Sequence, residues 1–187
     1  MSLLDIWKQS PEIRDKHIKQ IFGFAGDGKL LDGNSTSKEF RELLSNVDSF
    51  YLTQFCSQCL EEKFENSGFV LQDTVNEIGK RLGFDVTNGL YRGSSKKNGF
   101  DGLWKLSSED SIVVEIKTSS TYSIDFGVVA KYKNKLIQEG TVHPDKTSIL
   151  IVVGRIDTGG WEAQIRGSKY AWDIRIISRS FNSITSH

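Results

Sequence analysis

Runs of β-branched and aliphatic residues alternate with helix-like segments in the second half of the chain. The run TSILIVVG at 147–154 has the length and composition of a strand buried on both faces. We also predict extended segments at 84–91, 100–105, 111–118 and 172–178, and helices at about 69–82, 125–139 and 160–168. The order helix, three strands, helix, strand, helix, strand predicts an α/β sandwich with a central mixed sheet.

The first third of the chain predicts helices. Ser10-Pro11-Glu12 has the composition of a helix start, with serine as N-cap and proline in the first turn. Thr36 and Glu39 have the spacing of a capping box. A further helix from about 49 to 65 is expected to end at Gly68. We therefore expect an N-terminal helical lobe, 1–68, followed by an α/β core, 69–187.

Composition limits the compartment and the partners. The 187 residues suffice for a compact domain with a hydrophobic core, and no apolar run is long enough to cross a bilayer. The first residues lack the basic leader of a secretory signal. Cys56 and Cys59 form no disulfide framework and have no second pair for zinc, so we expect them in the core. These features predict a cytoplasmic protein without a membrane partner.

The charge balance argues weakly against a nucleic-acid partner. The chain has 24 basic and 24 acidic residues, whereas binding to phosphates favours a basic surface. The local distribution is different, because the segment 92–105 has four basic residues and one acid. Nucleic acid therefore remains a possible partner of this part of the chain.

The stretch NGFDGLWKLSSEDSIVVEIKTSS, residues 98–120, contains the most informative chemistry. Two extended runs flank a turn-rich segment, and a hairpin centred on Ser108 pairs Asp101 with Glu115. The Cβ atoms of such cross-strand neighbours lie about 4.5–5.5 Å apart. Two carboxylates at that separation repel each other unless a cation lies between them.

Lys117 is expected on the same face as Glu115, because side chains alternate along a strand. Ile112, Val114 and Ile116 then form the opposite face, which we expect to pack on the core. Two carboxylates suit Mg²⁺, and the Ile116 carbonyl is a candidate third ligand. Such an ion polarises a phosphate and activates water, while Lys117 orients or deprotonates that water and offsets developing charge. The cluster predicts hydrolysis of a nucleic-acid backbone.

The spacing of Asp101, Glu115 and Lys117 on a hairpin preceded by a helix resembles the PD-(D/E)xK nuclease superfamily. The resemblance covers roughly residues 69–180 and implies the restriction-endonuclease-like fold. It also implies that Asp101 and Glu115 bind the metal and that Lys117 assists the attacking water. Phe100 stands where the motif often has proline. Several members have a further acid on the preceding helix, which makes Glu77 a candidate metal ligand; a solvated helix face is the alternative.

Other polar residues are candidate phosphate contacts. The candidates are Lys96, Lys97, Gln164, Arg166 and Lys169. For the residues after 160, a solvated helix end is the alternative. The glycine-containing segment GRIDTGG, 154–160, lacks the Lys and Ser/Thr of a nucleotide-binding P-loop, so we interpret it as a strand-to-helix connection.

These features predict a Mg²⁺-dependent DNA endonuclease, of the kind found in prokaryotic restriction or defence systems. Cutting both strands requires two sites, so we expect a homodimer or a paired nuclease domain. The N-terminal lobe would mediate dimerisation or contact DNA. Two alternatives remain open: a nuclease selective for junctions or flaps, and a non-cleaving nucleic-acid-binding or interaction module on the same fold.

Overall fold

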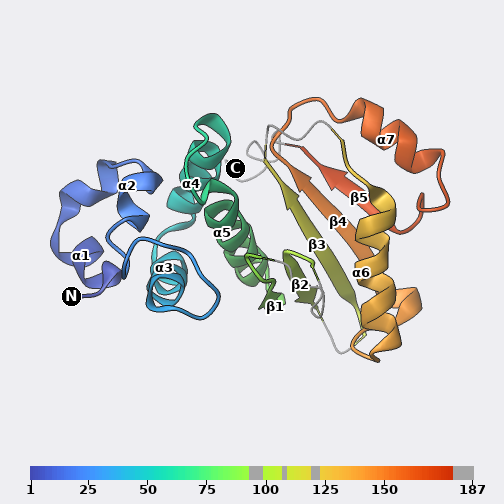
Figure 1. The fold of residues 1–187 in the computed structure, drawn as a ribbon, viewed down its shortest axis with the longest axis horizontal. Helices are drawn as coiled ribbons and strands as arrows, with labels where there is room; N and C mark the ends of the chain where they lie inside the picture. The colour runs from blue at the N-terminus through green and yellow to red at the C-terminus, as the bar shows by residue number, and fades with distance from the viewer. Residues whose placement is uncertain (93–98, 107–108, 119–122, 179–187) are drawn as a thin grey trace. The chain divides into compact units, whose positions relative to one another are not determined.

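A computed structural model describes residues 1–92, 99–106, 109–118 and 123–178. The protein has the predicted α/β composition, with N-terminal helices followed by a five-stranded mixed sheet with interleaved helices (Figure 1). The chain divides into two compact units, Met1–Arg81 and Leu82–His187. The helix Ser67–Arg81, which the sequence groups with the sheet, belongs by its contacts to the N-terminal unit. None of the described helices is both long and apolar enough to cross a membrane.

The N-terminal unit consists of short helices around a core of leucine, isoleucine and phenylalanine. Its elements are α1 (Leu3–Gln9), η1 (Pro11–Asp15), α2 (Ile18–Phe22), α3 (Ser35–Asn46), α4 (Ser49–Glu61) and α5 (Ser67–Arg81). The Phe40 and Phe55 side chains are fully buried in this unit. Trp7 packs edge-on against Tyr51, with ring centroids 4.8 Å apart. Apolar packing of this kind, rather than helix propensity, stabilises such short helices.

The predicted helix start at Ser10 is confirmed, with Ser10 as N-cap, Pro11 in the first turn and Glu12 following it, although the helix is a 3₁₀ helix and the Ser10 side chain makes no cap hydrogen bond. Two other local predictions for this unit are wrong. The Thr36 hydroxyl donates to the Ala25 carbonyl at 3.2 Å instead of capping α3, whose N-cap is Asn34. Gly68 does not end a helix, since it lies in the first turn of α5. At α3 a neighbouring residue, Asn34, replaced the cap that the local sequence suggested, and α4 ends at Glu61, before Gly68.

The C-terminal unit contains the sheet in the order β1-β2-β3-β4-β5. Its elements are β1 (Asp85–Asn88), β2 (Gly102–Lys105), β3 (Ser111–Lys117), α6 (Phe126–Gln138), η2 (Pro144–Lys146), β4 (Thr147–Val153), α7 (Gly159–Arg166) and β5 (Ile174–Ile177). The pairs β1–β2 and β2–β3 are antiparallel, whereas β3–β4 and β4–β5 are parallel. The predicted order of strands and helices is confirmed, with somewhat shorter bounds.

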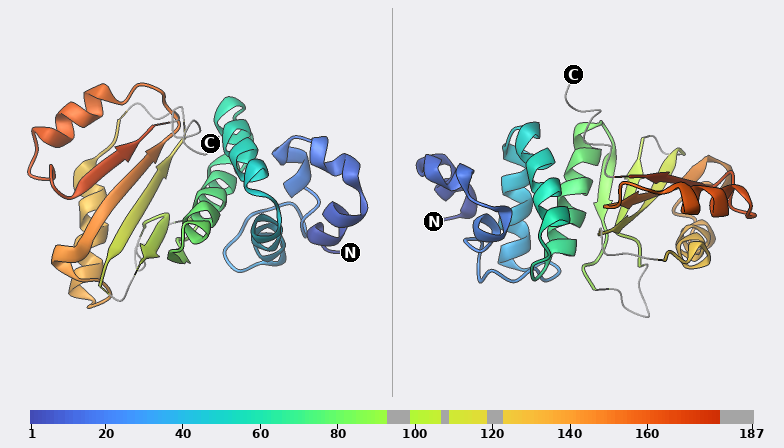
Figure 2. Two further views of the ribbon diagram at one scale, coloured as in Figure 1. Left: turned by 180° about the vertical axis from the view of Figure 1, so that it is seen from behind. Right: turned by 90° about the horizontal axis from the view of Figure 1, so that it is seen from above.

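The hydrophobic core of this unit lies on the face of the sheet that carries Val113. The core cluster joins Val113 and the β4 residues Ile149 and Ile151 to α6 and α7, with Trp161 and Ile165 coming from α7. Figure 2 shows α6 lying along one face of the sheet. Both parallel connections place their helices on this face, as right-handed crossovers require.

The sequence predicted burial only on the face of β3 that carries Val114; that face is buried, but the face that carries Val113 packs on the core as well. The face of β3 that carries Glu115 and Lys117 is the one that begins at Val113 in the core cluster. Val114 and Ile116 on the opposite face are buried as well. A strand with parallel neighbours is apolar on both sides, so the composition of β3 alone did not identify the core face.

Two further expectations concern single residues. Trp172, expected in the last strand, precedes β5 and is 89% exposed, so that prediction is wrong. Cys56 and Cys59 are both buried, as predicted for core cysteines. Burial raises the pKa of the Cys56 thiol to about 12, which keeps this thiol protonated and unreactive at neutral pH.

Candidate active site

The β2–β3 hairpin has the predicted register. Gly102 pairs with Val114 and Lys105 with Ser111, so the hairpin is centred on position 108. Position 101 thus falls opposite position 115, one residue beyond the end of the β2 ladder. The Asp101 amide donates to the carbonyl of Val114, the partner of Gly102, at 3.0 Å, so a backbone hydrogen bond holds Asp101 beside β3 where the regular ladder ends.

The Asp101 side chain completes the edge of β3 where β2 ends. Its Oδ2 accepts a hydrogen bond from the Ile116 amide at 2.6 Å. This contact places the carboxylate at the level of Glu115 and Lys117. Gly89 makes the arrangement possible, because its amide donates to the Asp101 carbonyl at 2.9 Å and a Cβ there would lie 1.9 Å from the Phe100 carbonyl oxygen. The close crossing of these two backbones requires glycine.

Glu115 and Lys117 contact each other on one face of β3, as strand alternation predicts. The Lys117 ammonium donates to Glu115 Oε1 and forms an ion pair with it. The Glu115 side chain is only 7% exposed, and its second oxygen, Oε2, is buried without a hydrogen-bond partner in the described part of the chain. A buried carboxylate oxygen without a partner is costly, so this atom is suited to a cation or a proton.

Both carboxylates have a raised pKa in the folded protein. Burial, and then the negative charge of Glu115, raises the pKa of Asp101 to about 7. Burial also raises the pKa of Glu115, although Lys117 opposes that shift. Burial lowers the pKa of Lys117, but its hydrogen bond to Glu115 and the charges of both acids outweigh burial and raise its pKa overall. One ammonium group does not offset two buried acids, which is the electrostatic signature of a functional site.

Tyr132 on α6 is a member of the site that the sequence did not indicate. A Cβ on Gly99, two residues before Asp101, would lie 2.9 Å from the Tyr132 hydroxyl. Burial raises the pKa of Tyr132, with Glu115 and Asp101 adding to the shift and Lys117 opposing it. The phenol thus lies within the electrostatic reach of all three motif residues. Its sequence context, a tyrosine between Lys131 and Lys133 on α6, does not specify a position in space.

The carboxylate pair fits a hard divalent cation. Mg²⁺ is usually held by one or two carboxylates and keeps several waters, and the unpartnered Glu115 Oε2 supplies a suitable donor beside Asp101. The Ile116 amide donates a hydrogen bond to Asp101. The role of the Ile116 carbonyl as a metal ligand stays a prediction. Among the described residues, no group of three or more His, Cys, Asp or Glu side chains has the arrangement of a metal site.

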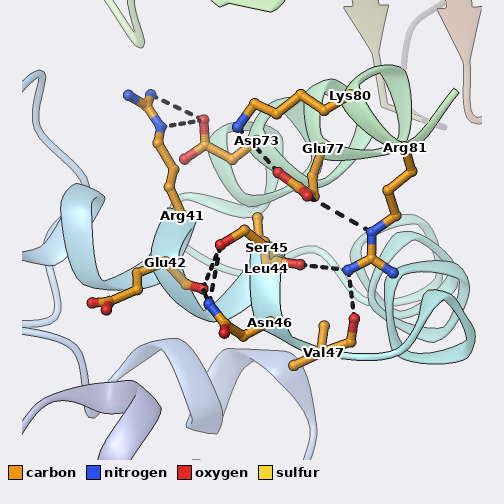
Figure 3. Close-up of polar contacts among 10 residues, drawn as sticks. All are labelled: Arg41, Glu42, Leu44, Ser45, Asn46, Val47, Asp73, Glu77, Lys80 and Arg81. Carbon is orange, nitrogen blue, oxygen red and sulfur yellow. Dashed lines mark hydrogen bonds and ion pairs between the residues drawn. The ribbon is translucent and has the colours of Figure 1, made fainter. Parts of the chain in front are cut away.

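Glu77 lies in the N-terminal unit, where its carboxylate already has cationic partners. Glu77 Oε2 lies 3.0 Å from the Lys80 ammonium and Oε1 lies 3.7 Å from Arg81 Nε (Figure 3). The same helix carries Asp73, which forms an ion pair with Arg41 at 3.0 Å. The role of Glu77 as a metal ligand stays a prediction, and these ion pairs are a competing use of its carboxylate.

The predicted phosphate contacts have different surroundings. Gln164 is exposed and lines a pocket beside the start of α7. Arg166 is exposed and pairs with Glu162 at 3.3 Å, and the Lys169 ammonium lies 5.3 Å from the centre of the Tyr170 ring. Lys96 and Lys97 lie outside the described residues. Their proposed contacts with DNA stay predictions.

Comparison with models of protein families, with curated proteins and with solved structures finds no match to this chain. The functional argument therefore depends on the geometry and chemistry of the site itself.

Proposed function

We propose that this chain is a Mg²⁺-dependent DNA endonuclease that hydrolyses phosphodiester bonds with Asp101, Glu115 and Lys117. One observation carries the proposal: the half-buried Asp101 and the buried Glu115 lie beside one lysine, and Glu115 Oε2 has no hydrogen-bond partner among the described residues. A binding surface gains nothing from two acids that repel each other, whereas a site for a divalent cation requires them.

The architecture supports the same proposal. Helices interleave with a five-stranded mixed sheet, and the acids lie where an antiparallel hairpin adjoins the parallel strands. This is the arrangement expected for a restriction-endonuclease-like α/β sandwich, to which the motif of Asp101, Glu115 and Lys117 bears its resemblance. A role in a prokaryotic restriction or defence system is the corresponding biological proposal.

Each residue of the site has a distinct task. Asp101, fixed by the Ile116 amide, and Glu115 would hold the ion, with the Ile116 carbonyl as a further candidate donor. When bound, Mg²⁺ polarises the scissile phosphate and makes a bound water more acidic. The Lys117 ammonium orients the attacking water and offsets the negative charge that develops on the phosphate. The Tyr132 hydroxyl is available to donate a hydrogen bond to a phosphate oxygen.

Substrate binding and assembly complete the proposal. Lys96, Lys97, Gln164, Arg166 and Lys169 are the candidate contacts with DNA phosphates. One site cuts one strand, so a double-strand break requires a homodimer or a paired nuclease domain, with the N-terminal helices as a candidate dimerisation or DNA surface. The ratio of linear to nicked plasmid should then rise with protein concentration.

Cleavage of supercoiled plasmid and of labelled oligonucleotides tests the activity. Wild type should nick DNA with Mg²⁺ and not with EDTA, and Asp101→Asn and Lys117→Met should each reduce the rate on the order of 10²- to 10⁴-fold. Lys133→Met is the matched control, because Lys133 is a buried lysine paired with Asp173 Oδ1 at 2.6 Å. It should lower stability and retain cleavage. A wild type that binds DNA but cuts no substrate would instead favour the non-cleaving module.

A further inference from the structure

A small open pocket lies where the chain leaves β4 and enters α7. Its volume is about 180 Å³, and it is lined by Arg155, Asp157, Thr158, Gly160, Trp161 and Gln164. This segment includes the GRIDTGG run, which lacks the residues of a P-loop. The pocket nevertheless combines a planar cation, a carboxylate and an amide around one space.

The Arg155 guanidinium lies over the ring of a buried tryptophan. Its central carbon lies 5.2 Å from the centre of the Trp161 ring, within the range of a cation–π contact. Trp161 is 8% exposed and belongs to the core cluster of the sheet. The buried indole therefore holds the guanidinium at the wall of the pocket.

The other polar groups favour a nucleobase over a phosphate. The Thr158 hydroxyl donates to Glu162 Oε1 at 2.7 Å, and Asp157 Oδ1 accepts from the Gly159 amide at 3.0 Å, so the loop is held in shape. Asp157 brings negative charge to the pocket, which opposes binding of an anion. A guanidinium plane for stacking, with a carboxylate and an amide for hydrogen bonds to a base edge, matches the recognition of unstacked bases.

The pocket lies close to the proposed catalytic lysine along the sheet. Val153 pairs with Lys117, and the Gly154 amide donates to the Lys117 carbonyl at 2.9 Å. Arg155 is the next residue, so strand spacing and chain geometry place its Cα within about 12 Å of the Lys117 Cα. Trp161 packs in the same core cluster as Val113, which precedes Glu115 on its face of β3. A nucleotide in the pocket would lie only a few nucleotides along the strand from the scissile phosphate.

We propose that this pocket holds an unpaired base of the cut strand, stacked on Arg155, and thereby directs the nuclease to single-stranded or flap-containing DNA. The inference rests on the proposed function, since it names the substrate of the same site. A base within a duplex is stacked on both faces and does not present its face to a protein, whereas an unpaired base does.

Binding without cleavage gives the first test. Glu115→Gln protein in EDTA is titrated into an oligonucleotide with an unpaired 2-aminopurine, and its fluorescence is followed. Arg155→Ala should weaken binding about tenfold, and Arg155→Lys should not restore it, because lysine keeps the charge and loses the plane. Arg175→Ala, which removes the same charge from an exposed position on β5, should bind as the parent protein does. Equal affinities for all of these variants would overturn the proposal.

Competition distinguishes a base from a phosphate as the occupant. Deoxyadenosine, which has no phosphate, should displace the probe from the parent protein and not from residual complexes of Arg155→Ala. Inorganic phosphate should have no effect beyond that of ionic strength. Displacement by inorganic phosphate at matched ionic strength, without displacement by the nucleoside, would contradict the base assignment.

Cleavage assays on wild type and Arg155→Ala, both with Glu115 intact, distinguish failure of the nuclease proposal from failure of the pocket proposal. With Mg²⁺, wild type should cut flap-containing or single-stranded DNA at least tenfold faster than the matched duplex, and Arg155→Ala should lose this preference. If wild type cuts DNA and Arg155→Ala keeps the preference, the pocket proposal alone fails. If no substrate is cut but the nucleoside still binds at Arg155, the nuclease proposal fails and the substrate assignment falls with it, leaving a nucleoside-binding pocket.

Discussion

The protein contains two clusters of buried acids, and they differ in how their charge is balanced. In the N-terminal unit, Asp73 and Glu77 lie on one face of α5 with Arg41, Lys80 and Arg81 around them (Figure 3). Arg81 also donates to the Leu44 and Val47 carbonyls and to the Ser49 hydroxyl. Each acid has a cation, and one of these cations, Arg81, is itself anchored to the backbone.

The cluster on the sheet has the opposite balance. Asp101 and Glu115 lie beside Lys117, and Glu115 Oε2 has no hydrogen-bond partner within the described ranges. Burial and the proximity of Glu115 raise the pKa of Asp101 to about 7. The N-terminal cluster is satisfied within the protein, whereas the sheet cluster is satisfied only when a cation or a proton is added. Excess charge, rather than the mere burial of acids, distinguishes the candidate site.

The two buried glutamates give the largest expected contrast. Glu115→Gln should reduce Mg²⁺-dependent cleavage on the order of 10²- to 10⁴-fold without loss of stability. Glu77→Gln should leave cleavage within about threefold and cost about 1–2 kcal/mol, because Lys80 and Arg81 lose their partner. Plasmid cleavage and urea denaturation measure the two effects. A loss of cleavage in Glu77→Gln equal to that in Glu115→Gln would make Glu77 the third ligand that the sequence suggests.

Removal of one cation should destabilise the balanced cluster. Arg41→Ala takes a cation from Asp73, whose side chain is fully buried, so we expect a loss of about 3 kcal/mol in the free energy of unfolding. Cleavage at a temperature well below the unfolding midpoint should persist. Urea denaturation of Arg41→Ala beside Arg41→Lys measures the loss, and an unchanged midpoint would show that this ion pair contributes nothing to stability.

Neutralising one acid of the sheet cluster should raise the stability of the protein instead of lowering it. The folded-state pKa of Asp101, about 7, lies above the ordinary value of 3.8 for an aspartate, so protons favour the folded state and stability falls as pH rises between these values. In EDTA, Asp101→Asn should therefore gain stability over wild type progressively from about pH 4 to 7, reaching about 1–3 kcal/mol at pH 8. Urea denaturation at pH 5 and pH 8 measures the difference. A variant less stable than wild type at pH 8 would mean that the acids are not mutually destabilising.

Tyr132 provides the smallest expected effect on the sheet cluster. Tyr132→Phe removes the hydroxyl beside Gly99 and keeps the ring in the core, so cleavage should fall about tenfold with little change in stability. Tyr170→Phe is the matched control, since Tyr170 also packs against the core cluster. Equal rates for both variants would remove Tyr132 from the site.

The sequence predicted the parts of the structure that depend on local spacing. The symmetry of residues around position 108 gave the hairpin register, and alternation gave the common face of Glu115 and Lys117. The packing of the Val113 face was not predicted because it depends on the crossovers through α6 and α7, which the hairpin does not encode. Tyr132 and Gly89 were not identified because their importance arises only when distant segments meet.

Binding of Mg²⁺ in the absence of DNA tests the excess charge of the sheet cluster most directly. The unfolding midpoint is measured in EDTA and in 10 mM Mg²⁺ for wild type and for Asp101→Asn/Glu115→Gln. An ion that binds the folded state with a millimolar dissociation constant should stabilise wild type by about 1.4 kcal/mol, a rise of roughly 3–5 °C, and leave the double variant unchanged. An equal shift in both proteins, or no shift in wild type, would contradict a divalent-cation site at Asp101 and Glu115.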